Sequence, residues 1–304
     1  MPSQRHIEHG PAVVGRFAPT PSGPLHFGSL LAALASWLDV RSQGGRWLLR
    51  IEDIDPPRCP PGASDTIIKQ LDAFGLYHDG AVEYQHDHDS DYQMALDALV
   101  NAGMAYPCSC SRKEWQHFSV YPGWCRHGPL HPERDVAWRL RTDIGDPDIC
   151  WQDRRMGHQR WSLPELGDVV LKRRDGLWAY QLAVVADDAR QGITDIVRGA
   201  DLLDNTPWQV RLQQALGYPT PRYLHLPLVV AANGQKLSKQ NMAPALPLQD
   251  HAVRPLLHDA LTLLGQSPEQ SMRHAPVSHQ LSAAVNGWRP HFLTSHNVQQ
   301  TTSS

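Results

Sequence analysis

The first residues in this sequence that could do chemistry lie in the stretch 15–30, which reads GRFAPTPSGPLHFGSL. Its apolar start and end predict a strand and a helix. The glycines and prolines between them define one backbone path and let a ligand approach closely. Gly28 and Ser29 fall near the predicted helix start, where free N–H groups favour an anion. The stretch therefore predicts a phosphate loop, although an ordinary turn with a serine cap would fit it equally well by itself.

A second stretch with suitable chemistry is KLSKQ at residues 236–240, which follows a strand-like run over 223–230. Lys236 and Lys239 stand on either side of Ser238 and could neutralise phosphates as mobile positive charges. A solvated surface loop is the alternative for a lone pair of lysines.

Charged side chains also follow two predicted strands. Glu52 comes after an alternating run over 46–51, and Arg198 comes after a buried run over 193–197. Ligands of open parallel sheets bind at the carboxyl ends of the strands. Glu52 and Arg198 could therefore contact a ligand. Helix capping and surface ion pairing are the alternatives for these charges.

Three cysteines lie close together in the sequence at Cys108, Cys110 and Cys125. Thiols at this density in a cytoplasmic protein indicate a zinc site. Thiols packed as small apolar groups are an equally good interpretation. A tetrahedral site needs a fourth ligand, and the spacing alone favours a histidine over the tyrosine among the candidates Tyr121, His117, His127 and His131.

The elements that must position these residues alternate as strand and helix, which predicts a doubly wound parallel α/β sheet. The pattern is interrupted by a stretch poor in long apolar runs. Strands are predicted at 12–17, 46–51, 136–141, 168–172, 193–197 and 223–230, with helices at 30–40, 63–75, 90–102, 178–192, 204–216 and 251–264. The predicted divisions are 12–103 and 167–245 for two halves of one domain, 104–166 for an insertion, 246–293 for a helical C-terminal segment and 294–304 for a disordered tail.

Composition limits the class of protein. The chain has 304 residues and a net charge of −3, which excludes a uniformly basic nucleic-acid binder but allows local basic patches. No run approaches the ~20 apolar residues of a membrane span, and no signal peptide is visible. The odd number of cysteines indicates a reducing compartment, so we expect a cytoplasmic protein with no membrane partner.

The two phosphate-type stretches, in this order, resemble the HIGH and KMSKS signatures of class I aminoacyl-tRNA synthetases. The first has the Pro-x-Pro-Ser-Gly-x-Leu-His form of the glutamyl and glutaminyl branch. RIEDID at 50–55, YQLAVVADD at 180–188 and VRGADLL at 197–203 resemble further motifs of that branch. Ser29 replaces the second histidine of the first signature, which is usual in the glutamyl branch. Gln240 replaces the last serine of the second signature, which affects only that serine's role.

The resemblance implies a Rossmann-like catalytic domain, ATP with Mg²⁺, and a set of site residues. His26, Lys236 and Lys239 would be catalytic. The implied ATP contacts are Pro19, Thr20, Pro21, Ser22, Gly23, His26, Gly28, Ser29, Lys236, Ser238 and Lys239, and the implied glutamate contacts are Arg16, Ala18, Thr20, Glu52, Tyr180 and Arg198. The implied ligands of one structural zinc ion are Cys108, Cys110, Tyr121 and Cys125, with His127 second to Tyr121.

Only some 60 residues follow the lysine stretch, and their end is polar. With so short a C-terminal part, the chain resembles the glutamyl-Q tRNA(Asp) synthetases, a family of short paralogues of the glutamyl-tRNA synthetases. It implies activation of L-glutamate without tRNA and transfer to the queuosine base in the anticodon of tRNA(Asp), by a monomer. Three alternatives are a synthetase that charges the 3′ end of tRNA(Glu), a small-molecule nucleotidyltransferase and a non-catalytic tRNA-binding paralogue.

Overall fold

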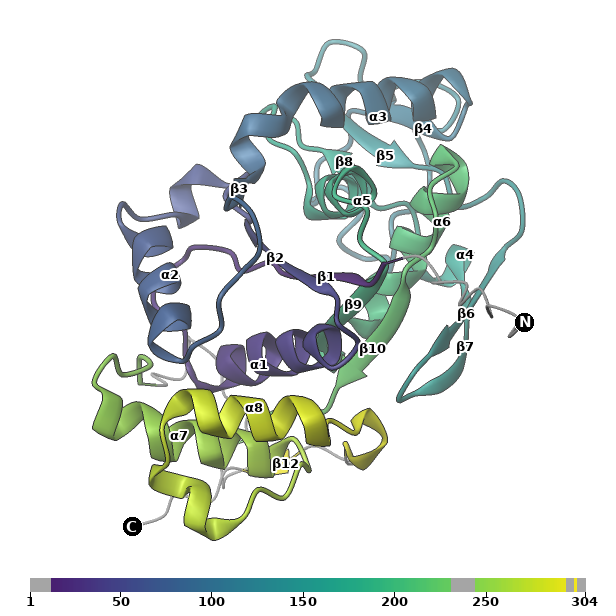
Figure 1. Cartoon of the computed structure of the whole chain (residues 1–304). Helices are drawn as coiled ribbons and strands as arrows, with labels where there is room; N and C mark the ends of the chain where they lie inside the picture. The colour runs from purple at the N-terminus through teal and green to yellow at the C-terminus, as the bar shows by residue number, and fades with distance from the viewer. Residues whose placement is uncertain (1–11, 231–243, 294–297, 300–304) are drawn as a thin grey trace, which may run out of the picture.

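The computed structural model describes residues 12–230, 244–293 and 298–299. At its centre is a seven-stranded sheet with the order β3-β2-β1-β9-β10-β6-β7 (Figure 1). Its strands are β1 (Val14–Phe17), β2 (Arg46–Ile51), β3 (Glu83–Tyr84), β6 (Asp148–Asp153), β7 (Gly157–Ser162), β9 (Asp195–Gly199) and β10 (Arg222–Leu226). The neighbouring pairs are parallel except β6 with β7. The chain proceeds from β1 to one edge and later restarts at β9 towards the other edge, so the predicted doubly wound sheet is confirmed.

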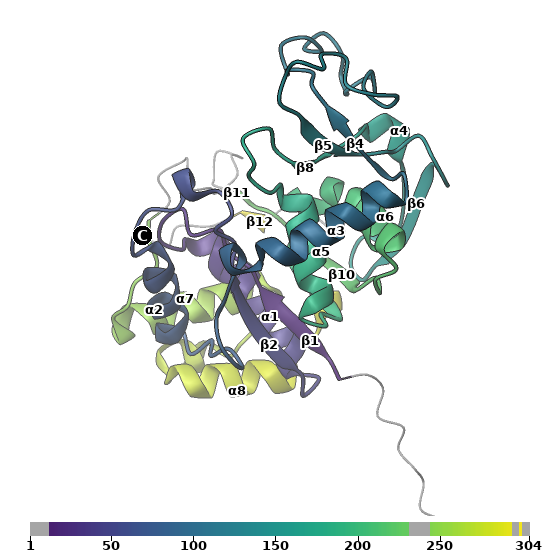
Figure 2. The same cartoon turned by 90° about the horizontal axis from the view of Figure 1, so that it is seen from above.

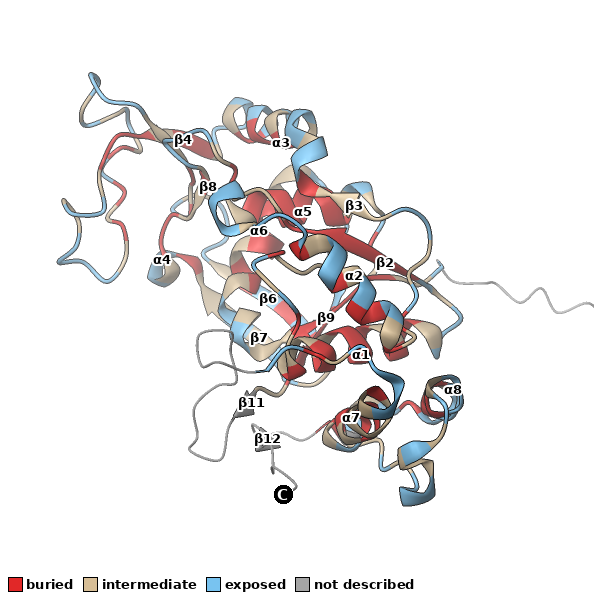
Figure 3. Cartoon of the chain, turned by 90° about the vertical axis from the view of Figure 1, so that its left-hand side faces the viewer, coloured by how far each residue is buried: buried red, intermediate tan, exposed pale blue. Residues whose placement is uncertain are grey.

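The central strands are buried on both faces, as a sheet covered by helices requires. In β2, the side chains of Trp47, Leu49 and Ile51 are fully buried, and so is the guanidinium of Arg50. Figure 3 shows that buried residues concentrate in β2 and in the helices that pack on the sheet. The sequence places the strand correctly at residues 46–51, because its apolar run ends in polar residues on each side.

Helices cover both faces of the sheet (Figures 1 and 2). On one face lie α1 (Phe27–Arg41), α2 (Ala63–Ala73), α7 (Asp250–Leu263) and α8 (Val277–Gly287), and on the other lie α3 (Asp89–Asn101), α5 (Tyr180–Arg190) and α6 (Thr206–Leu216). Each group of helices shares a hydrophobic core. All the predicted helices are present, and α1 begins at Phe27 rather than at residue 30 because His26 caps it.

A second, antiparallel sheet stands beside this body (Figure 2). It consists of β4 (Ala105–Cys108), β5 (Ala137–Leu140) and β8 (Val170–Lys172) in that order. The predicted insertion, 104–166, is therefore divided between two sheets. The hairpin of β6 and β7 extends the main sheet. The next strand, β8, completes the small sheet, and α4 (Leu163–Leu166) lies between β7 and β8 in the sequence.

The C-terminal segment is helical, with α7 and α8 packed against α1. Short 3₁₀ helices occur at Pro56–Arg58, Gln85–His88, Ala200–Asn205, Gln270–His274 and Pro290–Phe292. Within the stretch predicted to be disordered, β12 (Val298–Gln299) pairs with β11 (Val229–Val230), and the other residues of that stretch after Leu293 lie outside the described part. Among the described residues, no helix is long and apolar enough to cross a membrane.

Candidate functional site

The residues predicted to bind glutamate all line one cavity of about 660 Å³. They are Arg16, Ala18, Thr20, Glu52, Tyr180 and Arg198. Arg16 lies in β1, Glu52 directly follows β2, and Arg198 lies near the end of β9. The cavity therefore opens at the carboxyl ends of the central strands, next to the point between β1 and β9 where the winding direction changes.

The turn between β1 and α1 is closed by His26, which is the N-cap of α1. Its Nδ1 accepts hydrogen bonds from the backbone N–H groups of Gly28 (3.1 Å) and Ser29 (3.4 Å). In this structure the ring of His26 therefore occupies these two N–H groups, which the sequence led us to expect near an anion. Because Nδ1 accepts, the ring proton of neutral His26 lies on Nε2, which makes this nitrogen a donor. The other predicted ATP contacts in this turn are Pro19, Thr20, Pro21, Ser22 and Gly23, of which Thr20 lines the cavity.

The lysine stretch lies outside the described residues, and with it Lys236, Ser238 and Lys239. The chain that follows it is held against the turn, since Ala245 forms a β-bridge with His26. Gln70 of α2 reinforces this contact: it accepts from the backbone N–H of Leu25 (2.7 Å) and donates to the carbonyl of Leu246 (3.0 Å). Ala245 and Leu246 are thus fixed beside the turn that carries His26.

A buried ion network supports the floor of the cavity. Asp188 of α5 accepts two hydrogen bonds from Arg16, at 3.0 and 3.3 Å, and lies 2.9 Å from Nη2 of Arg50. Arg50 also lies 3.5 Å from Glu52 and 3.7 Å from Asp187. Burial alone would raise the pKa of Asp188, but the two guanidinium groups lower it below its usual value.

Glu52 is the acid of this network that faces the cavity. Burial raises its pKa to about 7, against the opposing effect of Arg50 and Arg16. Its Oε1 lies 3.5 Å from Nη2 of Arg50 and has no hydrogen-bond partner in the described part of the chain. A cationic group in the cavity would favour the ionised carboxylate.

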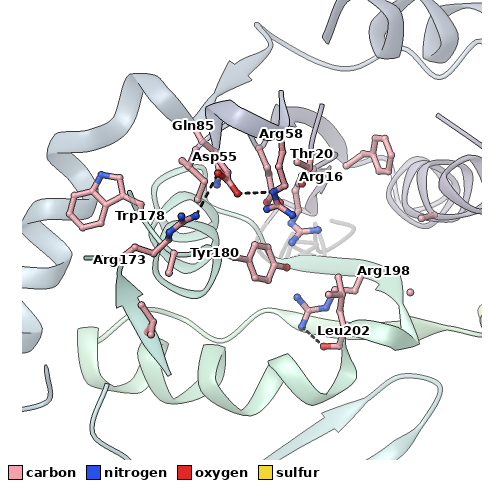
Figure 4. Close-up of a pocket in the computed structure, with 18 of the residues that line it drawn as sticks. Arg16, Thr20, Asp55, Arg58, Gln85, Arg173, Trp178, Tyr180, Arg198 and Leu202 are labelled. Atoms are coloured by element: carbon pink, nitrogen blue, oxygen red, sulfur yellow. Dashed lines mark hydrogen bonds and ion pairs between the residues drawn. The ribbon is translucent and has the colours of Figure 1, made fainter. Parts of the chain in front are cut away.

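Across the cavity, Arg198 and Tyr180 point towards Arg16 (Figure 4). Arg198 is 5% exposed, and its Nη1 has no hydrogen-bond partner among the described atoms. Burial raises the pKa of Tyr180, so its hydroxyl stays protonated and can donate a hydrogen bond. Two guanidinium groups and a phenol thus converge on the same space.

The mouth of the cavity is bridged by Asp55, which joins the two halves of the chain (Figure 4). Its carboxylate lies 2.7 Å from Nε of Arg58 and 3.5 Å from Nη1 of Arg173. Arg173 and Val170 also line a second hollow, a groove of about 1030 Å³ beside the small sheet. The cavity and this groove therefore meet at β8 and the loop after it.

The groove is lined by arginines and aromatic rings. These are Arg112, Arg139, Arg173 and Arg174, with Trp115, Tyr121 and Trp208. Arg139 lies over the ring of Tyr121, at 4.2 Å from its centroid, and its Nε is buried without a partner in the described structure. Acidic side chains share the lining: Asp168 is paired with Arg126, Asp175 is paired with Arg173, and Asp135 is exposed. The groove offers guanidinium groups next to flat rings.

A cluster of thiols lies under the groove. The sulfur atoms of Cys108, Cys110 and Cys125 all lie within 4.8 Å of one another and are buried. The hydroxyl of Tyr121 is 3.5 Å from the sulfur of Cys110. Burial raises the pKa of Cys110 to about 12. Burial also opposes ionisation of Cys125, but hydrogen bonds from Tyr121 and the backbone N–H of Leu130 lower its pKa to about 6.

The sulfur atoms lie close to the spacing that a tetrahedral metal ion needs: Cys110 and Cys125 are 3.5 Å apart, and two sulfur atoms bound to one zinc at about 2.3 Å are just under 4 Å apart. Only thiols belong to it among the described residues, so no histidine completes it. His127, the second choice for the fourth ligand, is exposed. The hydroxyls of Tyr121 and Ser109 lie next to the sulfur atoms, Tyr121 at 3.5 Å from Cys110 and Ser109 at 3.9 Å from Cys125.

Sequence reasoning did not assign roles to Arg50, Gln70 or Asp188. Each had a signal in the sequence: Arg50 interrupts an apolar strand, Gln70 lies between the apolar helix positions Ile67 and Leu71, and Asp188 ends an apolar helical run. A polar residue in an apolar pattern is usually a buried group with a partner. The identity of the partner requires the tertiary structure.

The sequence is similar to those of known proteins that would need such a site. The sequence model described as "tRNA synthetases class I (E and Q), catalytic domain" matches residues 12–118 and 130–280. A protein named glutamyl-Q tRNA(Asp) synthetase from Pseudomonas putida is 50% identical over 293 residues, which cover 95% of this chain and 94% of that protein. Another of the same name from Pseudomonas aeruginosa is 52% identical over 277 residues, covering 90% and 93%.

Solved structures with the same fold include glutamate tRNA ligases. One from Elizabethkingia meningosepticum, in complex with its amino acid, superposes with a TM-score of 0.82 at 23% identity and covers 95% of this chain and 67% of that one. A glutamate-tRNA synthetase from Elizabethkingia anophelis superposes with a TM-score of 0.83 at 23% identity, covering 96% and 68%. At this identity the superpositions establish the fold.

Proposed function

Because the chain belongs to the class I tRNA synthetases of the glutamyl and glutaminyl branch, we propose that it activates L-glutamate with ATP, without tRNA, and transfers it to the queuosine base in the anticodon of tRNA(Asp). The observation that carries the proposal is the cavity in which Arg16, Arg198, Glu52 and Tyr180 converge. Its charges complement those of an amino acid with an acidic side chain.

Glutamate would bind with its side-chain carboxylate between Arg16 and Arg198. Both arginines are buried and held from behind, so their remaining N–H groups are already oriented. Glu52, which lines the cavity, would accept from the α-ammonium group, and Tyr180 would donate to the substrate. Ala18 and Thr20 would complete the wall of the cavity.

The glutamate α-carboxylate would then attack the α-phosphorus of ATP, and pyrophosphate would leave. His26 would donate from Nε2 to a phosphate oxygen. Lys236 and Lys239 would add positive charge where negative charge develops. Lys239 precedes Ala245 by only six residues, and Ala245 lies beside His26, which supports this assignment. Mg²⁺ bound with the ATP would neutralise phosphate charge.

The acceptor would reach the activated glutamate from the groove beside the small sheet. Single-stranded RNA binds through phosphate contacts to arginine and base stacking on aromatic rings, and the groove offers both. Because Arg173 lines both hollows, a base held at that end of the groove would lie next to the glutamate cavity. We assign the anticodon loop to this groove.

The metal site would be structural. We propose that Cys108, Cys110, Cys125 and Tyr121 hold one Zn²⁺, which would fix the loops around the small sheet and one wall of the groove. We also propose that the protein acts as a cytoplasmic monomer and that residues 104–166 are an insertion in the sequence between the catalytic halves, of which the hairpin of β6 and β7 joins the catalytic sheet.

Charging of the 3′ end of tRNA(Glu) is the second candidate, because the solved structures that superpose are glutamate tRNA ligases. The first candidate is favoured by the relatives with 50% identity over nearly their whole length. A non-catalytic tRNA-binding paralogue is less consistent with a cavity that retains all its charged groups.

Two measurements test the proposal. Exchange of pyrophosphate into ATP should depend on glutamate and proceed without tRNA; a protein that binds tRNA(Asp) without this exchange would be the non-catalytic paralogue. Labelled glutamate should then attach to a tRNA(Asp) anticodon hairpin that contains queuosine, and not to the same hairpin with guanosine. Label found on the terminal adenosine of tRNA(Glu) instead would establish the second candidate.

A further inference from the structure

Arg198 is held by contacts behind the cavity. Its Nε donates to Nε2 of His225 at 3.1 Å, and its Nη2 donates to the hydroxyl of Thr206 at 2.8 Å. His225 is the residue of β10 that pairs with Arg198 in the sheet, and it is completely buried. With Nε and Nη2 occupied, Nη1 is the group of Arg198 without a partner in the described structure.

His225 is in turn held by Asp153, the last residue of β6. Oδ2 of Asp153 lies 2.6 Å from Nδ1 of His225. The other carboxylate oxygen accepts from the backbone N–H groups of Arg155 (3.0 Å) and Met156 (2.8 Å). Asp153 is 1% exposed, and both its oxygens are therefore fixed.

These contacts determine the tautomer of His225. A carboxylate can only accept, so the ring proton lies on Nδ1, and Nε2 keeps the lone pair that Arg198 Nε–H needs. Burial and the charge of Arg198 lower the pKa of His225, although Asp153 opposes them, and the imidazole is consequently neutral. Burial would raise the pKa of Asp153, but the bond from His225 and the backbone N–H of Met156 lower it.

The arrangement differs from that of the other arginine in the cavity. Asp188 contacts Arg16 directly and at two points. For Arg198, a neutral ring separates the guanidinium from the carboxylate of Asp153. The ring fixes the orientation of Arg198 without placing a negative charge in contact with it, so its positive charge remains available to a ligand.

We propose that His225 and Asp153 are positioning residues for Arg198, which direct its Nη1 into the cavity and make the site prefer a carboxylate side chain over an amide. The proposal rests on the proposed function, since it takes glutamate as the substrate. A side-chain amide would offer Nη1 only a neutral oxygen, whereas a carboxylate would also balance the buried charge.

The test compares three variants by steady-state pyrophosphate exchange. His225→Leu removes the acceptor for Arg198, His225→Gln keeps an oxygen acceptor within reach, and Asp153→Asn offers the ring an N–H group and so favours the opposite tautomer. For His225→Leu and Asp153→Asn we expect the KM for glutamate to rise about tenfold or more, as loss of a hydrogen bond to a charged group implies. The KM for ATP should stay within about twofold of its original value. His225→Gln should restore much of the affinity.

Discrimination is the second readout. The ratio of kcat/KM for glutamate to that for glutamine should fall in His225→Leu and Asp153→Asn and recover in His225→Gln. Asp79→Asn is the matched control, because Asp79 likewise accepts a backbone N–H, from Trp47, and a side-chain bond, from Arg41, but lies away from the cavity. It should change neither KM nor the ratio.

A third readout does not depend on activity. The ¹⁵N shifts of His225, assigned by comparison with His225→Gln, should show the proton on Nδ1. The inference is overturned if the proton is on Nε2, if the unaltered glutamate KM and ratio persist in His225→Leu, or if the KM for ATP rises equally. If Asp153→Asn does not fold, the two His225 variants decide. Absence of exchange in the unaltered protein would instead refute the proposed function and leave the ¹⁵N test to decide the positioning role.

Discussion

Arg16 and Asp188, which are 172 positions apart in the sequence, form a buried two-point ion pair at the base of the cavity. Asp188 also contacts Arg50, so one carboxylate balances two guanidinium groups. Asp188→Asn should destabilise the protein by about 3–5 kcal/mol, because it leaves buried charge unpaired. Urea unfolding measures this effect. Asp143→Asn, at a partly exposed ion pair with Arg141, should cost less than about 1 kcal/mol; equal stability of the two variants would contradict the role of Asp188.

Glu52 should make glutamate binding depend on pH. Burial raises its pKa from 4.5 to about 7. Between these pH values the folded, ligand-free protein holds a proton that the unfolded chain has lost, so the free energy of unfolding falls as the pH rises. The substrate ammonium group favours the ionised form, and the KM for glutamate should therefore fall roughly tenfold between pH 6 and pH 8. Glu52→Gln should bind weakly with a flat profile, and an equally steep profile in that variant would assign the titration to another group.

Lys239 should be needed for adenylate formation but not for folding. Lys239→Ala should slow pyrophosphate exchange by about 100-fold, which corresponds to roughly 3 kcal/mol for one oriented cation at developing phosphate charge. Circular dichroism and thermal unfolding should be unchanged. Lys69→Ala, at an exposed position on α2, is the control and should be fully active. Near-normal exchange in Lys239→Ala would refute its assignment.

The thiol cluster should hold one zinc ion per chain. Metal analysis of protein purified without chelator should find it, and Cys110→Ser should lose it, because one of three close sulfur ligands is removed. Tyr121→Phe should weaken retention against a chelator, whereas His127→Ala should not. The reverse result for the last two variants would make His127 the fourth ligand, and a protein without zinc would leave the cluster as packed thiols.

Arg112 should contribute to RNA transfer and not to glutamate activation. It is exposed, and it lines the groove but not the glutamate cavity. Arg112→Ala should leave pyrophosphate exchange unchanged, weaken binding of the anticodon hairpin, and reduce the slope of log affinity against log salt by about 0.7–0.9 if one phosphate contact is lost. Arg46→Ala, exposed at the start of β2, is the matched control. Identical binding in both variants would exclude Arg112 from the RNA site.

Local sequence patterns were sufficient for much of the fold. The apolar run at 46–51 predicted β2 with its observed bounds, and the helical spacing at 63–75 and 90–102 predicted α2 and α3. Glu52 and Arg198 could be placed on the same side of the sheet, because the carboxyl ends of parallel strands lie together. In these cases the deciding interactions are between near neighbours, or follow from the strand order that the alternating pattern implies.

The sequence did not predict the hairpin of β6 and β7, because the third buried position of β6 is the charged residue Asp153, and β7 is partly exposed and mostly polar. Their place in the main sheet depends on the pairing of Tyr223 with Asp153. The position of this hairpin in turn brings Asp153 to His225, and hence fixes Arg198.

The sequence by itself thus identified Arg16, Glu52 and Arg198 as charged residues of the cavity, and only the tertiary structure decided what holds them. Arg16 and Arg198 look alike in the sequence, as single arginines in or after apolar strands. In the fold, one is bound directly by a carboxylate and the other through a neutral imidazole. The partner of a buried charge is chosen by long-range packing, because every compact arrangement must satisfy such charges, and several acidic residues in this chain could have done so.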